Sequence, residues 1–276
     1  MASNTQQGAA DGHRADTVVI IPARYASTRF PGKPLTQISG PDGVSRSLVH
    51  WSYLAAQEAA VDAQICVATD DARIADEVSS FGGNTVFTPE SCRNGTERVA
   101  ACLDMFPDAE LFVNLQGDAL LTPPDFVRSL VASMRENPDM QVCTAGVRST
   151  EATYRHLAED AEQGRVGGTT VVLNADGHAL YFSKRMLPYL PSKAIPDENT
   201  PIYLHLGLYA YRRKALERYV ALDVTMLETV EGLEQLRFLV HGIPVNVLVF
   251  PEPTFAMVEV NNMSDVAIVE QILRDR

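Results

Sequence analysis

The stretch from Val18 to Leu35 constrains the fold most, because an apolar run is followed at once by a loop that carries three cations. A short run of β-branched residues that ends at Pro22 is typical of a buried parallel strand. In open α/β sheets, ligands bind at the loops that leave the carboxyl ends of such strands. We therefore expect this loop to bind a polyanion such as a nucleotide triphosphate, with a solvated basic loop as the alternative. Its cations are Arg24, Arg29 and Lys33.

The rest of the chain predicts a Rossmann-like α/β fold, because helical and strand patterns alternate over its first half. Helices are expected over 47–60, 71–81, 94–106 and 123–137, and strands over 64–69, 85–87, 111–115 and 141–147. The alternation of helix and strand patterns ends near residue 148. There the patterns predict a hairpin over 169–183, a long loop over 188–201, strands over 203–212, 244–249 and 256–260, and helices over 225–241 and 264–273.

These patterns indicate a mixed, mainly parallel sheet flanked by helices, with a nucleotide-binding first half. A smaller antiparallel lobe in the C-terminal half is expected to serve substrate binding and dimerisation. We divide the chain into a disordered tail (1–16), a nucleotide-binding part (17–147), the substrate and dimerisation lobe (148–243) and a return to the main sheet with a closing helix (244–276). The loop over 188–201 is a possible lid over the substrate.

The charge balance excludes some partners. With a net charge of −12, the chain repels nucleic acids and anionic membranes, so the cations of the first loop stand out. No apolar run is long enough to span a membrane, and the polar first residues do not form a secretory signal. The four cysteines show no CxxC spacing, which favours reduced cytoplasmic thiols.

A magnesium site is predicted where two strand-like segments end. Gly117 allows a sharp turn after the strand over 111–115, so that the carboxylate of Asp118 points from the ligand edge of the sheet. Magnesium prefers oxygen ligands and needs only one or two protein groups beside substrate phosphates. Asn261 follows the strand expected over 256–260 and is a second, neutral candidate ligand. The alternatives are a turn-capping role for Asp118 and a helix-capping role for Asn261 and Asn262.

Nucleotidyl transfer suits this pattern, because it needs orientation and charge stabilisation rather than a nucleophile on the protein. An acceptor oxygen would attack the α-phosphorus in line, and pyrophosphate would leave. The second half offers donors for an acidic acceptor, although each of them is more often structural, and Glu234 with Arg237 also fits a solvated pair. These donors are His205, Tyr209, Glu234, Gln235 and Arg237.

Several separated motifs resemble those of the CMP-Kdo synthetases, the cytidylyltransferases that activate 3-deoxy-manno-octulosonate (Kdo). The likeness runs from Thr17 to the end of the chain. It is nearly continuous over 19–35. It continues in Val67-Ala68-Thr69-Asp70, in Asn94-Gly95-Thr96-Glu97-Arg98, over 113–118, in Tyr181-Phe182-Ser183, over 205–212 and over 233–237.

The resemblance implies a Rossmann-like nucleotidyltransferase fold of GT-A-like type. It further implies CTP as co-substrate, magnesium, a homodimer and a cytoplasmic place in lipopolysaccharide biosynthesis. It also implies which residues contact each substrate. The nucleotide would be held by Arg24, Ser27, Arg29, Lys33, Asn94, Gly95 and Thr96, and the sugar acid by Gln116, His205, Tyr209, Glu234 and Gln235. Arg24, Lys33 and Asp118 would carry the catalysis, and Asp118 with Asn261 would bind the metal.

The chain departs from the pattern of that family at five positions. Ala119 stands where the family normally has an acidic residue, Asn261 where it has Asp, and Cys92 where it has His. Asn94 stands in place of Ser, and Thr170 in place of Lys. Asn261 removes a negative charge from the metal site, which is expected to weaken magnesium binding, and Thr170 removes a cation. The acceptor therefore stays open between Kdo, another ulosonic acid such as an 8-amino variant, and a small phosphonate of secondary metabolism. A catalytically inactive nucleotide-binding homologue is the third alternative.

Overall fold

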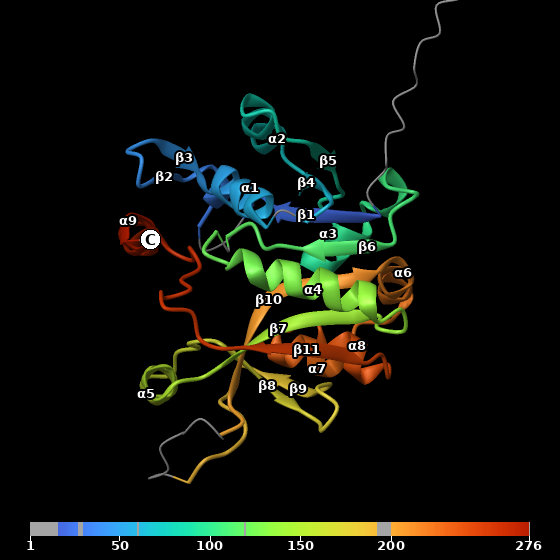
Figure 1. Cartoon of the computed structure of the whole chain (residues 1–276), viewed down its shortest axis with the longest axis vertical. Coiled ribbons are helices and arrows are strands. Elements are labelled where there is room, and N and C mark those ends of the chain that lie inside the picture. The colour runs from blue at the N-terminus through green and yellow to red at the C-terminus, as the bar shows by residue number, and fades with distance from the viewer. Residues whose placement is uncertain (1–15, 27–29, 60, 119, 192–199, 276) are drawn as a thin grey trace, which may run out of the picture.

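The computed structural model describes residues 16–26, 30–59, 61–118, 120–191 and 200–275. A nine-stranded sheet runs through its centre in the order β11-β7-β10-β6-β1-β4-β5, and β8 and β9 extend it beside β10 (Figure 1). Its strands are β1 (Thr17–Ala23), β4 (Gln64–Thr69), β5 (Thr85–Phe87), β6 (Leu111–Asn114), β7 (Val142–Arg148), β8 (Thr169–Leu173), β9 (Ala179–Ser183), β10 (Tyr203–Arg212) and β11 (Val245–Phe250). A separate hairpin pairs β2 (Gln37–Ser39) with β3 (Ser45–Ser47).

The sheet is mixed and mainly parallel in its main body, which confirms the predicted fold class. Strand β1 lies parallel to β4 and β6, β4 to β5, and β7 to β11. Strand β10 runs antiparallel between β6 and β7, and its first residues also pair with the β8–β9 hairpin. The carboxyl ends of β1 and β6 therefore meet at one edge, as the sequence predicts.

Helices cover both faces, and the alternation of side chains along β1 explains why. Val18 and Ile20 pack into the core beneath α3 and α6, whereas Val19 and Ile21 pack into the core beneath α1, α2 and α4. The helices are α1 (Leu48–Glu58), α2 (Ala72–Ser80), α3 (Gly95–Ala100), α4 (Pro124–Glu136), α5 (Glu151–Glu162), α6 (Arg213–Ala221), α7 (Met226–Glu231), α8 (Leu236–Val240) and α9 (Met263–Asp275), with 3₁₀ turns η1 (Lys33–Leu35) and η2 (Leu103–Met105).

The segment over 251–262 connects two distant parts of the molecule. It leaves β11 near one end of the sheet and returns to α9, which lies beside the β2–β3 hairpin (Figure 1). Glu270 of α9 accepts a hydrogen bond from the backbone N–H of Ser39, and buried Val260 packs with Ile38 and Leu48. This crossing carries Asn261 to the site built by β1 and β6.

Three predicted elements are wrong. The residues over 256–260 form no strand, because the chain crosses the sheet edge after Pro251 and Pro253, which cannot donate to a strand ladder. The helix expected over 225–241 is split into α7 and α8 by Gly232, which has a left-handed φ of 63°. The helix expected over 94–106 ends at Ala100 and is followed by η2.

Other elements were not predicted, or lie partly outside the described residues. The sequence did not predict α5, α6 or the β2–β3 hairpin. The expected tail over 1–16 lies outside the described residues except for Asp16, whose carboxylate accepts hydrogen bonds from Thr17 and Arg135. The possible lid over 188–201 lies outside them at 192–199. Across the described residues, every helix is too short or too polar to cross a bilayer.

Candidate functional site

The loop after β1 holds the first cations of the site. Arg24 directly follows the strand and is exposed, and Gly32 closes the loop by donating its N–H to the carbonyl of Tyr25 at 3.0 Å. Gly32 has a left-handed φ of 71°, and the chain then forms η1, which presents Lys33. Ser27 and Arg29, predicted to contact the nucleotide, lie outside the described residues.

Gly117 and Asp118 lie in a turn after β6, as the sequence indicated, and a close approach to β1 further explains why glycine is needed there. A Cβ atom on Gly117 would lie 2.6 Å from the carbonyl oxygen of Pro22, so only glycine allows the chain after β6 to pass so close to the end of β1. The carbonyl of Gly117 accepts a hydrogen bond from Ser52 of α1 at 2.9 Å. Asp118 is thereby held next to the loop after β1.

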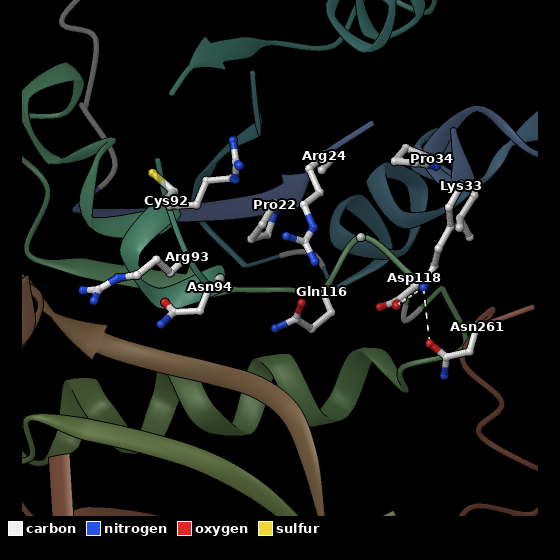
Figure 2. Close-up of a pocket in the computed structure, with 15 residues that line it drawn as sticks. Pro22, Arg24, Lys33, Pro34, Cys92, Arg93, Asn94, Gln116, Asp118 and Asn261 are labelled. Atoms are coloured by element: carbon white, nitrogen blue, oxygen red, sulfur yellow. Dashed lines mark hydrogen bonds and ion pairs between the residues drawn. The ribbon is translucent and has the colours of Figure 1, made fainter. Parts of the chain in front are cut away.

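Lys33 joins the two residues predicted to bind magnesium. Its ammonium donates to the Asp118 carboxylate and lies 3.5 Å from Oδ1 of Asn261 (Figure 2). Asp265 accepts hydrogen bonds from the backbone N–H groups of Asn261 and Asn262, so the Asn261 side chain is not needed as a helix cap. Two oxygens from distant segments thus converge on one cation, and carboxylate and amide oxygens are ligand types that magnesium accepts.

Glu259 adds a second carboxylate that the sequence analysis did not single out. Its Oε2 accepts a hydrogen bond from Nδ2 of Asn261 at 3.4 Å. The negative charge of Asp118 raises the pKa of the Glu259 carboxyl to about 7. We attribute this shift to the neighbouring charge more than to burial, because the Glu259 residue is exposed where it lines a cavity.

A cavity of about 260 Å³ opens between the β1 loop, the start of α3 and the end of β6. Figure 2 shows Arg24, Asn94 and Gln116 around this space, with the Lys33–Asp118 pair at one side. Arg93 and the buried Arg98 also line the cavity, and the sequence analysis did not assign them a role. Their place in the sequence could have indicated a role, because Arg93 directly precedes the Asn94-Gly95-Thr96-Glu97-Arg98 motif and Arg98 ends it.

A larger cavity of about 910 Å³ adjoins the first. It lies toward the second half of the chain, and the predicted acceptor residues His205, Tyr209, Glu234 and Gln235 all line it. Both cavities share four lining residues, namely Arg93, Asn94, Gln116 and Asn261. Two ligands bound in these cavities would therefore meet at the Gln116–Asn261 boundary.

His205 and Tyr209 lie on the same face of β10, with ring centroids 5.3 Å apart. The pairing of β10 with β7 is interrupted by a bulge between Leu206 and Tyr209. Thr144 stabilises this bulge, because its hydroxyl contacts the Leu208 carbonyl at 2.7 Å and Nε2 of His205 at 3.1 Å. Burial lowers the pKa of His205 to about 3, so the imidazole is neutral at pH 7.

Gln235 brings an unused donor to the second cavity. The residue is buried, and within the described part of the chain its Nε2 has no hydrogen-bond partner. A buried donor of this kind is costly unless a ligand or water accepts from it. Thr170, by contrast, is buried and fully engaged, because its hydroxyl donates to the Arg185 carbonyl at 2.6 Å.

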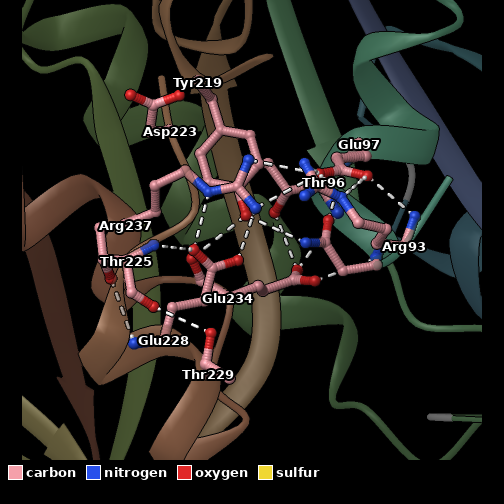
Figure 3. A network of polar contacts seen from close by, with 12 residues as sticks. Arg93, Thr96, Glu97, Tyr219, Asp223, Thr225, Glu228, Thr229, Glu234 and Arg237 are labelled. Atoms are coloured by element: carbon pink, nitrogen blue, oxygen red, sulfur yellow. Dashed lines mark hydrogen bonds and ion pairs between the residues drawn. The ribbon is translucent and has the colours of Figure 1, made fainter. Parts of the chain in front are cut away.

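Two side chains accept hydrogen bonds from the N–H groups at the start of α3, and Figure 3 shows one of them, Glu234, beside Thr96. Asn94 caps the helix, with Oδ1 accepting from the N–H of Glu97 at 2.8 Å. Glu234 accepts from the N–H groups of Gly95 and Thr96 and from the Thr96 hydroxyl. Burial raises the pKa of the Glu234 carboxyl, and these hydrogen bonds oppose the rise. The predicted nucleotide contacts of Gly95 and Thr96 thus lie where Glu234 already occupies both N–H groups.

Arg237 follows Glu234 in the same segment, and its backbone N–H donates to the Glu234 carbonyl. Its side chain is fully buried, its guanidinium pairs with Glu228 at 2.5 Å and Glu97 at 3.2 Å, and it stacks on the ring of Tyr219 (Figure 3). The alternative of a solvated Glu234–Arg237 pair is therefore wrong. Glu234 and Gln235 lie in the turn before α8, not on a helix as predicted.

The comparisons with known proteins match most of the chain. The model of the cytidylyltransferase family matches residues 18–247. The 3-deoxy-manno-octulosonate cytidylyltransferase of Maricaulis maris (strain MCS10) is 44% identical over 84% of this chain and 86% of its own length. The protein of the same name from Chlamydia pneumoniae is 38% identical over 92% of each chain.

A solved structure agrees with these relatives. The structure described as CMP:2-keto-3-deoxy-manno-octonic acid synthetase complexed with CTP superposes with a TM-score of 0.80. It is 32% identical and covers 94% of this chain and 98% of its own.

Proposed function

The chain belongs to the 3-deoxy-manno-octulosonate cytidylyltransferase family, and on that premise we propose that it transfers CMP from CTP to Kdo or a related ulosonic acid. It is a CTP-dependent nucleotidyltransferase of the EC 2.7.7 type. The alternatives of a phosphonate acceptor or an inactive homologue are not favoured by these relatives.

The observation that carries the proposal is the junction of the two cavities beside the Lys33–Asp118 pair. The smaller cavity lies at the carboxyl ends of β1 and β6, where open α/β sheets bind nucleotides. The larger cavity offers an unpaired donor from Gln235 and a neutral His205, which suit the hydroxyl and carboxylate groups of a sugar acid. A donor and an acceptor substrate would meet at Gln116.

On the nucleotide side, we assign charge stabilisation to Arg24 and Lys33. Both side chains line the smaller cavity, and a triphosphate there would accept hydrogen bonds from them. Lys33 contacts Asp118 in the free protein, so binding of CTP exchanges a carboxylate partner for a phosphate. Ser27, Arg29, Asn94, Gly95 and Thr96 remain proposed nucleotide contacts through the family likeness.

The reaction then follows from positioning. A hydroxyl oxygen of the acceptor, held in the larger cavity, attacks the α-phosphorus of CTP. The new P–O bond forms as the bond to the bridging oxygen of the β-phosphate breaks, and pyrophosphate leaves with that electron pair while the hydroxyl proton is released. Arg24 and Lys33 stabilise the charge of the transition state and of the leaving group.

We propose Asp118 and Asn261 as magnesium ligands. The fit rests on their oxygens, which converge on the Lys33 ammonium in the free protein and are of the type that magnesium prefers. When bound, the ion would supply additional positive charge to the phosphates and the attacking oxygen. The two residues would hold it next to the junction of the cavities.

A homodimer and a cytoplasmic place in lipopolysaccharide biosynthesis complete the proposal. The dimer is supported by exposed apolar side chains on α7, since Met226 is 76% and Val230 is 75% exposed. The cytoplasmic place is consistent with four free cysteines, three of them buried.

A pyrophosphate-release assay with CTP, magnesium and a panel of acids tests the proposal. Turnover with Kdo or its 8-amino variant is expected. Turnover only with a phosphonate would show that the acceptor is a phosphonate and not a sugar acid. Binding of CTP without turnover of any acid would show that the protein is an inactive homologue.

A further inference from the structure

Glu259 lies beside the proposed metal site on the segment that crosses from β11 to α9. Asn261, two residues later, contacts Lys33 through Oδ1 and Glu259 through Nδ2. Lys33 in turn contacts Asp118. The four side chains therefore form one continuous chain of polar contacts, with a carboxylate at each end.

The charge of this group is incomplete for a divalent cation. Asp118 supplies one negative charge and Asn261 supplies none, whereas the ligand charge count strongly affects the affinity of a site for hard cations. Two further carboxylates contact Asn261: that of Asp265 is engaged by the backbone N–H groups of Asn261 and Asn262, whereas that of Glu259 contacts the Asn261 side chain.

Glu259 is free to take such a role. Among the described residues, its carboxylate has one hydrogen bond, the 3.4 Å contact from Asn261, and the residue is exposed. The other acids that line the larger cavity are engaged: Glu234 closes α3, Glu228 pairs with buried Arg237, and Glu252 accepts from Thr153 at 2.5 Å.

We propose that Glu259 is a second carboxylate ligand of the magnesium ion and supplies the negative charge that Asn261 lacks. The inference rests on the proposed function, because it assumes a metal at Asp118. It assigns a metal-binding role to the 251–262 crossing, beyond that of a connection between β11 and α9.

Binding of Mn²⁺ to the full chain, followed by electron paramagnetic resonance with and without CTP, tests the proposal. Glu259→Gln is expected to weaken Mn²⁺ binding about tenfold or more, whereas Glu252→Gln, the same change on the same segment, is expected to leave it within about twofold. Asn261→Asp is expected to restore the affinity of the Glu259→Gln variant, because it returns the lost charge.

Two measurements separate the outcomes. CTP binding in EDTA shows whether Glu259→Gln still folds and binds nucleotide, and Glu259→Asp, which keeps the charge, is expected to lose less Mn²⁺ affinity than Glu259→Gln. Unchanged Mn²⁺ affinity in Glu259→Gln, or an altered acceptor KM alone, would overturn the role of Glu259 and leave the proposed function intact. Wild-type protein that binds no Mn²⁺ with CTP and releases no pyrophosphate would instead overturn the proposed function.

Discussion

The ammonium of Lys33 donates a hydrogen bond to the carboxylate of Asp118, across 85 positions of sequence. One residue follows β1 and the other follows β6, and these neighbouring strands are parallel. In the free protein the pair neutralises itself. In our proposal, CTP provides a phosphate partner for Lys33 and a metal ion provides a partner for Asp118, so the pair is the resting state of the site.

Lys33→Met tests the phosphate role of this pair. Loss of the cation is expected to lower kcat by about 10²- to 10³-fold, because one donor to the transition-state charge is removed. Binding of Mn²⁺ to the free protein is expected to persist or improve, since Asp118 is released. Steady-state kinetics and Mn²⁺ titration provide the check, with Lys214→Met, at an exposed position of α6, as the control. Wild-type kinetics in Lys33→Met would contradict the proposed contact between Lys33 and the phosphates.

Asp118→Ala tests the metal role. We expect turnover to fall below detection while the circular dichroism spectrum and the melting temperature stay close to those of the wild type. The reason is that Asp118 supplies charge at the site and is not part of the core. Asp139→Asn, an exposed acid after α4, serves as the control. Activity within a few-fold of the wild type would exclude Asp118 as a metal ligand.

Arg237→Met is expected to destabilise the protein by about 3–5 kcal/mol, because it leaves Glu228 buried without its guanidinium partner. Arg155→Met, which removes an exposed pair with Glu151, is expected to cost about 1 kcal/mol or less. Urea unfolding measures both. Equal costs would show that Arg237 is not an energetic anchor of the turn that carries Glu234.

His205 gives the protein a defined sensitivity to acid. The pKa of His205 is about 3 in the folded protein, below its ordinary value near 6.5, so the unfolded state binds more protons between these values. Stability is therefore lost as the pH falls from about 6.5 toward 3, by up to about 1.4 kcal/mol per pH unit. In His205→Gln, the free energy of unfolding is expected to fall less steeply over that range. Identical slopes in both proteins would contradict the burial of a neutral imidazole.

The sequence predicted the sheet well, because its strands are runs rich in apolar or aromatic residues with clear ends. Strands β4, β5 and β10 have the predicted bounds. The strand expected over 256–260 failed because an apolar pattern does not distinguish a strand from an extended crossing that buries Val260. The helix over 225–241 failed because Gly232 was not recognised as a left-handed helix end.

The candidate site was predictable only in part. Lys33 and Asp118 were found because each follows a buried strand, and parallel strands end at the same edge. Glu259 had no such signal, since its proximity to Asn261 and Asp118 depends on the path of the crossing segment. The binding of the Gly95 and Thr96 N–H groups by Glu234 was equally invisible, because it joins residues about 140 positions apart.

The central claim is that CTP and a sugar acid react at the junction of the two cavities. Phosphorus NMR of the protein with CTP, magnesium and Kdo tests it most directly. We predict that the three CTP resonances are replaced by one phosphodiester resonance and by pyrophosphate, and that omission of Kdo prevents the change. CTP resonances that stay unchanged with Kdo and with each other acid tried, or conversion to CDP and inorganic phosphate, would contradict the account.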